Sequence, residues 1–353
     1  MEERQGERAA WRDRLREGVV IPAHPLALRS DHSLDERRQR ALTRYYVAAG
    51  AGGLAVGVHT TQFAIHDPKI ALLRPVLQLA AETLDDALHG DGLIRIAGIC
   101  GETAQAVAEA ELAVELGYHA GLVSPAALSA SEEADWAAHI RTVADTIPVI
   151  AFYLQPAVGG RVLPYTFWRR VLEIEQVVAI KIAPFNRYQT LEVFRAVVDA
   201  GRAGEIALYT GNDDHIVLDL LTTFRPTGDG AAVTVVGGLL GQWAVWTRRA
   251  VEYHAQCRRI VKSGRAVPPQ LLTLAAQVTD ANAAIFDPAN EFAGCIPGIH
   301  EVLRRQGLLA GTWTLGTEAL APDQRLAIDR VCRSYPHLTD DAFVAEHLDD
   351  WLR

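Results

Sequence analysis

Lysine is scarce in this chain, and one of its lysines lies where a primary amine could do chemistry. The 353 residues include 34 lysines and arginines, and the only lysines are Lys69, Lys181 and Lys262. Lys181 lies near the end of the apolar run 177–183. Apolar neighbours remove water from an amine, which lowers its pKa and leaves part of it neutral and nucleophilic. Arginine cannot supply this chemistry, so we expect Lys181 to attack a carbonyl and form a Schiff base. The alternative is an ordinary lysine that extends its amine from a strand end to solvent.

Short apolar runs, each followed by a stretch with helical spacing, recur along the chain. We predict eight strands, at residues 18–21, 53–58, 94–99, 120–123, 149–154, 178–182, 206–209 and 232–236. Strict alternation of strands and helices implies a parallel sheet, and eight units of about 30 residues are typical of a closed (β/α)8 TIM barrel. An open doubly wound sheet would carry a glycine-rich phosphate turn after an early strand. The glycine cluster 50–53 precedes its strand, so it is not a dinucleotide fingerprint.

The predicted barrel occupies only part of the chain. Residues 1–17 are charged, and we expect an N-terminal helix or arm there. The barrel is predicted over residues 18–262. The Val267-Pro268-Pro269 sequence interrupts the pattern, and no strand-like run follows it. Residues 263–353 are therefore predicted to form a helical C-terminal region that packs on the barrel.

Composition narrows the classes of partner. The formal net charge of −9 argues against nucleic-acid or anionic membrane partners, which need basic surfaces. No apolar run reaches the roughly 18 residues of a transmembrane helix, and the N-terminal residues lack the apolar segment of a secretory signal, so we expect a cytoplasmic enzyme. The histidines show no ligand spacing, and we predict neither a metal site nor a cofactor. The four cysteines are too scattered for a disulfide framework; they are Cys100, Cys257, Cys295 and Cys332.

Polar residues follow several of the predicted strands. In a barrel, the C-terminal ends of the strands form the active face, so these residues should converge on one pocket. They are His59, Thr60 and Thr61 after the second strand, Ser124 after the fourth, Tyr153 in the fifth, Lys181 in the sixth, and Thr210, Gly211, Asn212 and Asp213 after the seventh.

The order and spacing of three motifs resemble a known superfamily. Phe152-Tyr153-Leu154-Gln155-Pro156 is followed by Ala179-Ile180-Lys181, with 28 positions from Tyr153 to Lys181; the other motifs are the Thr60-Thr61 pair and Tyr209-Thr210-Gly211-Asn212-Asp213-Asp214. Together they resemble the dihydrodipicolinate synthase and N-acetylneuraminate lyase superfamily of class I, Schiff-base-forming aldolases. The resemblance covers residues 18–262.

The resemblance implies a role for each motif. Lys181 would form a Schiff base with the keto group of pyruvate or a related 2-oxo acid, and the Tyr153 hydroxyl would transfer protons. The iminium acidifies the neighbouring carbon, which permits aldol cleavage, condensation or dehydration. Thr60 and Thr61 would bind the substrate carboxylate, with Thr61 also counted as catalytic. Gly211 would let the backbone approach the substrate. His59 and Asn212 complete the predicted substrate contacts, although Asn212 and Asp213 could instead cap a helix.

The chain also departs from the family pattern. Where members carry Gly-Thr-Thr-Gly-Glu, this chain has His59-Thr60-Thr61-Gln62-Phe63. The segment Ser124-Pro125-Ala126-Ala127 lacks the tyrosine that some members donate across a subunit interface. Val158 stands where the synthase has an arginine, and Arg161 follows three residues later. These changes argue against dihydrodipicolinate synthesis and leave proton delivery to His59 or water.

Three functions follow from these residues. The first is a lyase that forms a Lys181 imine with a 2-oxo acid. The second is a catalytically silent family member that binds an oxo acid or sugar acid as a sensor or scaffold. The third is a barrel isomerase without an imine, using His59 with Asp213. The resemblance implies a homodimer or homotetramer.

Overall fold

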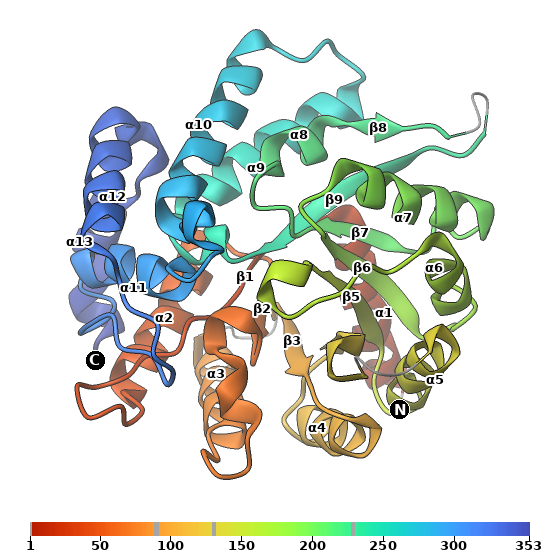
Figure 1. Cartoon of the computed structure of the whole chain (residues 1–353), viewed down its shortest axis with the longest axis horizontal. Helices are drawn as coiled ribbons and strands as arrows, with labels where there is room; N and C mark the ends of the chain where they lie inside the picture. The colour runs from red at the N-terminus through yellow and green to blue at the C-terminus, as the bar shows by residue number, and fades with distance from the viewer. Residues whose placement is uncertain (1, 88–91, 129–131, 227–229) are drawn as a thin grey trace.

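The computed structural model describes residues 2–87, 92–128, 132–226 and 230–353. Within them, eight parallel strands form a nearly closed barrel (Figure 1). The hydrogen-bonded order is β1-β9-β7-β6-β5-β4-β3-β2. Between β1 and β2 a single parallel bridge joins Ala23 to Ala55 and brings the two ends of the sheet together. The barrel strands are β1 (Val20–Pro22), β2 (Gly53–Val56), β3 (Ile94–Ile99), β4 (Ala120–Val123), β5 (Val149–Leu154), β6 (Val177–Ala183), β7 (Ala207–Thr210) and β9 (Val233–Leu240).

Helices cover the outside of the barrel and continue beyond it. The barrel helices are α2 (Glu36–Ala49), α3 (Leu73–Ala87), α4 (Thr103–Glu115), α5 (Glu133–Ala144), α6 (Tyr165–Val171), α7 (Arg187–Asp199), α8 (Ile216–Leu221) and α9 (Thr247–Ser263). Four helices follow: α10 (Pro269–Phe286), α11 (Cys295–Arg305), α12 (Pro322–Ser334) and α13 (Asp341–Trp351). The predicted TIM barrel with a helical C-terminal extension is confirmed. No helix in the described ranges combines the length and apolar character needed to cross a bilayer.

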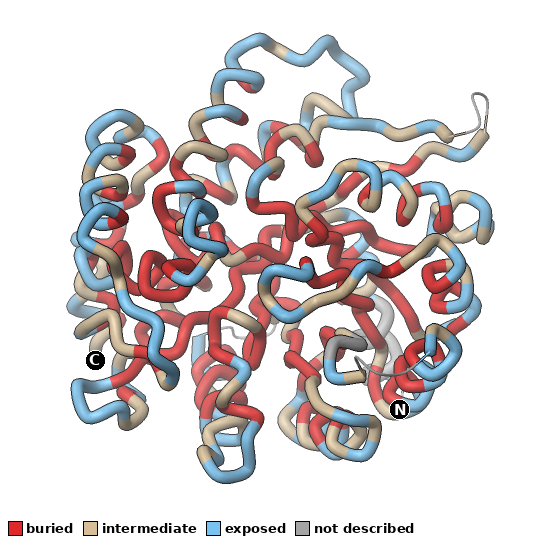
Figure 2. The backbone as a smooth tube through the Cα atoms, viewed as in Figure 1, coloured by how far each residue is buried: buried red, intermediate tan, exposed pale blue. Residues whose placement is uncertain are grey.

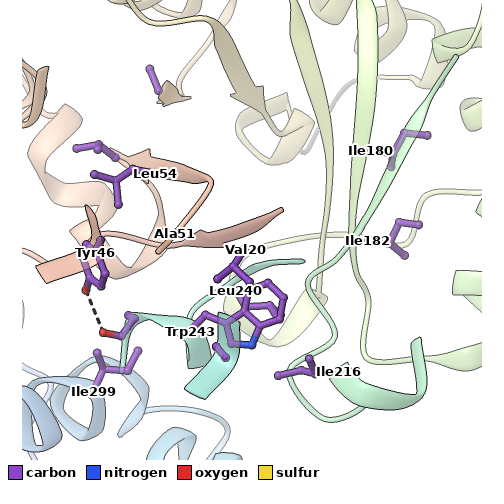
Figure 3. Close-up of a cluster of buried hydrophobic side chains, with 14 of the residues drawn as sticks. Val20, Tyr46, Ala51, Leu54, Ile180, Ile182, Ile216, Leu240, Trp243 and Ile299 are labelled. Carbon is purple, nitrogen blue, oxygen red and sulfur yellow. Dashed lines mark hydrogen bonds between the residues drawn. The ribbon is translucent and has the colours of Figure 1, made fainter. Parts of the chain in front are cut away.

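The strands are buried on both faces, because side chains line the barrel interior on one face and pack under the helices on the other. Figure 2 shows this burial along the whole central sheet. On β6, Ile180 and Ile182 belong to the outer cluster under the helices, while Ala179 and Ala183 belong to the inner one. Figure 3 draws Ile180 and Ile182 in the outer cluster. Side chains alternate along a strand, so Lys181, between these isoleucines, faces the barrel interior.

Helix α1 (Glu2–Glu17) closes the N-terminal end of the barrel, and Figure 1 shows it behind the strands. Trp11 and Leu15 join the inner apolar cluster. The Tyr209 hydroxyl donates to the carbonyl of Leu15 over 2.8 Å, and the Trp11 ring stacks on His119 with centroids 5.7 Å apart. A cavity that admits substrate must therefore open at the opposite end, where the strands have their C-termini.

A buried ion pair joins the segment after β2 to helix α4. The His66 imidazole donates from Nδ1 to Glu109 over 3.0 Å and from Nε2 to the carbonyl of Gly57 over 2.7 Å. Glu109 also accepts from the backbone amide of Cys100 over 2.8 Å. Burial alone would lower the pKa of His66, but hydrogen bonds to Cys100 and Glu109 raise it to about 10. The imidazole is therefore charged at neutral pH.

The helix after β7 begins later than the sequence predicts, and this affects the position of Asp213. The sequence predicts a helix over residues 213–223, whereas α8 begins at Ile216, so Asp213 lies in the loop. The carboxylate of Asp213 accepts a hydrogen bond from the backbone amide of Gln242, which ties this loop to the end of β9. A short strand, β8 (Thr223–Phe224), then pairs antiparallel with β9. The sequence also predicts one helix over residues 242–262, whereas the structure has the 3-10 turn η5 (Gln242–Ala244) followed by α9.

Candidate active site

Lys181 is buried inside the barrel, with 7% of the residue exposed. It pairs with Phe152 of β5, and its Nζ atom lies 4.1 Å from the centroid of the Phe152 ring. Burial lowers the pKa of the amine from 10.5 to about 8, and the nearby carboxylate of Asp213 opposes the change. At that pKa, about one amine in ten is neutral at pH 7. The amine therefore does not reach out to bulk solvent, and it meets the electrostatic requirement for a nucleophile.

The amine faces a cavity of about 50 Å³ at the C-terminal ends of the strands. Its walls are mainly apolar, and several are aromatic. The C-terminal region contributes directly, since α10 supplies Phe286 and the segment entering α11 supplies Phe292 and Cys295. The other lining residues are Ala23, Val58, His59, Thr60, Phe152, Leu154, Gln155, Val158, Ala183, Phe185, Gly211, Asp213 and Gly241.

Gly211 makes room for the lysine. A Cβ atom at this position would lie 2.8 Å from Cε of Lys181 and 2.7 Å from Cβ of Ala183, both too close. The backbone amide of Gly211 donates to the carbonyl of Ile182 over 2.7 Å, which fixes the loop against β6. Gly211 therefore lets the backbone approach the side chain of Lys181, and its predicted approach to the substrate stays a prediction.

Asp213 is the second buried ionisable group of the cavity. Its Oδ1 atom accepts from the backbone amide of Gln242 over 2.8 Å. Burial raises the pKa of its carboxyl from 3.8 to about 7, against the opposing effects of Gln242 and Lys181. The sequence predicts Asp213 near the pocket, as a substrate contact, a helix cap or part of an isomerase, but not as the partner of Lys181. A carboxylate two residues beyond Gly211, at the end of a barrel strand, was the available signal.

His59 and Thr60 also reach the cavity, as predicted from their position after β2. Both belong to the 3-10 turn η1 (His59–Thr61). Burial and the charge of Lys181 lower the pKa of His59 to about 4, and Glu318 opposes them, so the imidazole is neutral at pH 7. The Thr60 hydroxyl donates to the carbonyl of His24 over 3.4 Å, a long hydrogen bond that a substrate group could replace.

The Thr61 hydroxyl is occupied by backbone groups, which leaves it no site for the predicted catalytic and substrate-binding roles. This hydroxyl donates to the carbonyl of His24 over 2.6 Å and accepts from the backbone amides of Gly57, at 3.0 Å, and Val58, at 3.2 Å. A hydroxyl has one donor and two acceptor sites, and here all three are used. Thr61 instead holds the turn that presents His59 and Thr60.

Asn212, predicted as a substrate contact, does not line the cavity in this structure. Its Oδ1 atom accepts from the backbone amide of Phe185 over 3.0 Å, and its Nδ2 atom donates to Thr190 and to Asp219 over 3.3 and 3.1 Å. The side chain is fully buried. It therefore ties the loop after β7 to α7 and α8, leaving the cavity to its neighbours Gly211 and Asp213.

Tyr153 lies on the opposite face of β5 from the cavity. Its ring packs against Trp168 under the helices, with centroids 5.3 Å apart, and its hydroxyl accepts from the backbone amide of Leu163 over 3.1 Å. Burial raises the pKa of that hydroxyl, so it stays protonated. This placement contradicts the predicted role of Tyr153 as the proton-transferring residue. Phe152 occupies the position above the amine.

A register irregularity explains this outcome. Val149 pairs with Val177, but the next residue of β5, Ile150, pairs with Ala179, so β6 contains one extra residue. An extra residue reverses which side chains face inward beyond it. The 28-residue spacing of Tyr153 and Lys181 therefore does not place the two side chains on the same face.

The chain thus combines a (β/α)8 barrel with a buried lysine and a buried carboxyl that line one cavity at the C-terminal ends of the strands. Residues 18–263 match the model of the dihydrodipicolinate synthetase family, and the chain belongs to this family. The resemblance seen in the sequence is thereby confirmed.

The curated relatives have low sequence identity to this chain and match only part of it. The chain is 29% identical over 209 residues to the 4-hydroxy-tetrahydrodipicolinate synthase of Bifidobacterium longum, across 58% of this chain and 63% of the relative. It is 28% identical over 210 residues to the enzyme of that name from Desulforamulus reducens, across 58% and 64%. The matched region thus spans less than two thirds of these relatives.

Solved structures share the fold. The dihydrodipicolinate synthase of Acinetobacter baumannii complexed with pyruvate superposes with a TM-score of 0.72 at 17% identity, covering 90% of this chain and 99% of that one. The N-acetylneuraminate lyase of Fusobacterium nucleatum gives a TM-score of 0.69 at 16% identity, with the same coverage.

Proposed function

We propose that this chain is a lyase in which Lys181 forms an imine with pyruvate or a related 2-oxo acid, in aldol cleavage, aldol condensation or dehydration. The observation that carries the proposal is the buried Lys181 amine, with its lowered pKa, sharing a cavity with the Asp213 carboxyl. Family membership and the pyruvate complex of the Acinetobacter baumannii structure support it. A homodimer or homotetramer and a cytoplasmic location stay predictions.

The steps follow from the chemistry of an amine and a ketone. The neutral amine adds to the keto carbon to give a carbinolamine, whose hydroxyl leaves as water once it receives a proton, and a protonated imine remains. Loss of a proton from the adjacent carbon gives an enamine. The enamine carbon bonds to the carbonyl carbon of an aldehyde, and the aldehyde oxygen takes up a proton. Water then hydrolyses the imine, releasing product and restoring the amine. Cleavage is the reverse.

Asp213 is suited to move these protons in place of a tyrosine. In water, the pKa values of lysine and aspartic acid are 10.5 and 3.8, whereas in the cavity they are about 8 and about 7. The two pKa values are thus much closer together than in water, so a proton passes between the two groups at a much smaller cost in free energy. A general acid and base with a pKa near the working pH is the most effective kind.

The carboxylate of the oxo acid needs hydrogen-bond donors near the amine. The Thr60 hydroxyl lines the cavity and makes only the long bond to His24. Neutral His59 lines the same wall and can donate through a ring nitrogen. These two residues, with the cationic imine itself, would orient the substrate.

A second candidate is a family member that binds an oxo acid without turnover. The observation that favours it is Phe152, whose ring covers the amine and has no proton to donate. The two candidates differ in whether purified protein turns over a substrate, and whether that activity disappears in Lys181→Ala. Turnover that depends on Lys181 would eliminate the silent binder.

Reductive trapping tests the proposed imine. Purified protein is incubated with pyruvate and sodium borohydride, digested and examined by mass spectrometry. We expect a reduced adduct on the peptide that contains Lys181. The exposed Lys69 and Lys262 serve as internal controls in the same digest. An adduct absent from Lys181 across a broad panel of 2-oxo acids would refute the proposal.

A further inference from the structure

An aromatic pair from distant parts of the chain lines the Lys181 cavity. Phe185 follows β6, and Phe292 precedes α11. Their rings meet edge to face, with centroids 5.5 Å apart and planes at 82°. Both residues line the cavity and both are partly exposed, so they lie between Lys181 and solvent.

The backbone holds both aromatic residues in an uncommon conformation. The φ angle is +52° at Phe185 and +66° at Phe292, in the left-handed region that bulky side chains rarely adopt. The backbone amide of Phe185 donates to Asn212, and that of Phe292 donates to the carbonyl of Asp287 over 3.1 Å. Strained conformations of this kind persist where the surrounding structure imposes them, and they cluster at ligand sites. The folded chain therefore fixes two aromatic rings beside the reactive amine.

A second, outer cavity of about 370 Å³ adjoins the first and shares His59, Val158, Phe292 and Cys295 with it. Its charged lining residues, within the described part of the chain, are the exposed carboxylates of Glu291 and Glu318. No described arginine or lysine lines it.

The position at which the synthase carries an arginine offers no positive charge here. It is occupied by Val158, which lines both cavities. Arg161, three residues later, places its guanidinium 3.5 Å from the ring centroid of Trp136 and donates to the carbonyl of Leu128. Once the 2-oxo acid occupies Lys181, Thr60 and His59, a second anionic reactant would meet only the two carboxylates and apolar walls.

We infer that the aldehyde that reacts with the Lys181 enamine, or leaves it in cleavage, is an uncharged aldehyde with an aromatic or bulky apolar group, which packs against Phe185 and Phe292. This inference rests on the proposed function. It excludes aldehydes that carry a carboxylate or phosphate, since the cavity offers aromatic surface for an apolar group and carboxylates against an anion.

The inference is tested directly by comparing kcat/KM for an aromatic aldehyde and for an anionic aldehyde. With pyruvate held constant, kcat/KM is determined for benzaldehyde and for succinic semialdehyde, and we expect benzaldehyde to be favoured by at least about tenfold. Phe292→Ala should lower this ratio, while Leu272→Ala, at an exposed position on α10, should leave it unchanged. Glu318→Lys should raise kcat/KM for succinic semialdehyde by about tenfold, and Glu111→Lys, the same charge change on exposed α4, should not. Since Glu318 is exposed, its variant keeps the test informative if Phe292→Ala fails to fold.

Borohydride trapping with pyruvate alone separates this inference from the proposed function. If the adduct forms on Lys181 but succinic semialdehyde reacts as well as benzaldehyde, the selectivity is wrong and the lyase proposal stands. If no adduct forms, both are overturned. An adduct on Lys181, together with a preference for benzaldehyde that falls in Phe292→Ala, supports both.

Discussion

The pKa of Lys181 gives the most quantitative prediction. Burial lowers the pKa from 10.5 to about 8. Burial therefore favours the neutral amine. At pH 7, about one amine in ten is then neutral, compared with about one in three thousand for a lysine in water. Imine formation requires the neutral form, so its rate should follow this titration.

Asp213→Asn perturbs the titration in a defined direction. The Asp213 carboxylate favours the ammonium form of Lys181, so its removal should move the pKa of Lys181 further below 8. The rate constant of imine formation is measured with pyruvate from about pH 6 to about pH 10, with borohydride added at timed intervals and the Lys181 peptide quantified by mass spectrometry. The logarithm of the rate constant should rise with pH and level off near pH 8 in the unmodified chain. In Asp213→Asn it should level off at lower pH and at a lower maximum rate, because a proton donor is also lost.

Asp214→Asn is the matched control, since it changes the neighbouring, exposed carboxylate. It should leave the levelling pH of the unmodified chain in place. A rate constant that keeps rising towards pH 10.5 in the unmodified chain would show that Lys181 is an ordinary solvated lysine. A levelling pH that increases in Asp213→Asn would show that the carboxylate does not act on the amine as described.

Three further variants test individual contacts. Gly211→Ala places a methyl group against the stem of Lys181, and we expect at least about a tenfold slower imine formation with an unchanged circular dichroism spectrum; an unchanged rate would mean that the lysine stem can move aside. Tyr153→Phe removes only the hydroxyl that accepts from Leu163, so the imine rate should stay within about twofold while the unfolding free energy falls by about 1 kcal/mol; loss of trapping would restore Tyr153 as the proton-transferring residue. The pKa of His66 is raised from 6.5 to about 10, so its ion pair with Glu109 stabilises the fold fully below pH 6.5 and loses that effect as pH rises towards 10. In urea unfolding near pH 6, Glu109→Gln should therefore cost about 3 kcal/mol, and the cost should be smaller near pH 10; a cost independent of pH would contradict a charged imidazole.

The sequence was sufficient to predict the barrel and the inward lysine. Eight apolar runs alternating with helical patterns leave few other topologies. Lys181 was recognisable because a lysine within a continuous apolar run stands out in a chain that otherwise uses arginine. Those signals are local, and they survive errors of a few residues at the ends of elements.

The sequence did not predict the positions of side chains that depend on contacts between distant parts of the chain, or on one extra residue in a strand. The spacing from Tyr153 to Lys181 could not reveal the extra residue in β6, which pairs Lys181 with Phe152 in place of Tyr153. The hydroxyl of Thr61 is fully used by His24 and nearby backbone amides, and no pattern along the chain marks that contact. Phe292 was missed because the C-terminal region shows no strand-end signal, although its fold brings it to the cavity.

A crystal soaked with pyruvate tests the central claim most directly. We expect continuous electron density from Nζ of Lys181 to the keto carbon of pyruvate, with the carboxylate near Thr60 and the Tyr153 hydroxyl still bonded to the backbone amide of Leu163. Pyruvate bound in the cavity without a bond to Lys181, or a Tyr153 hydroxyl turned inward to the amine, would contradict the account.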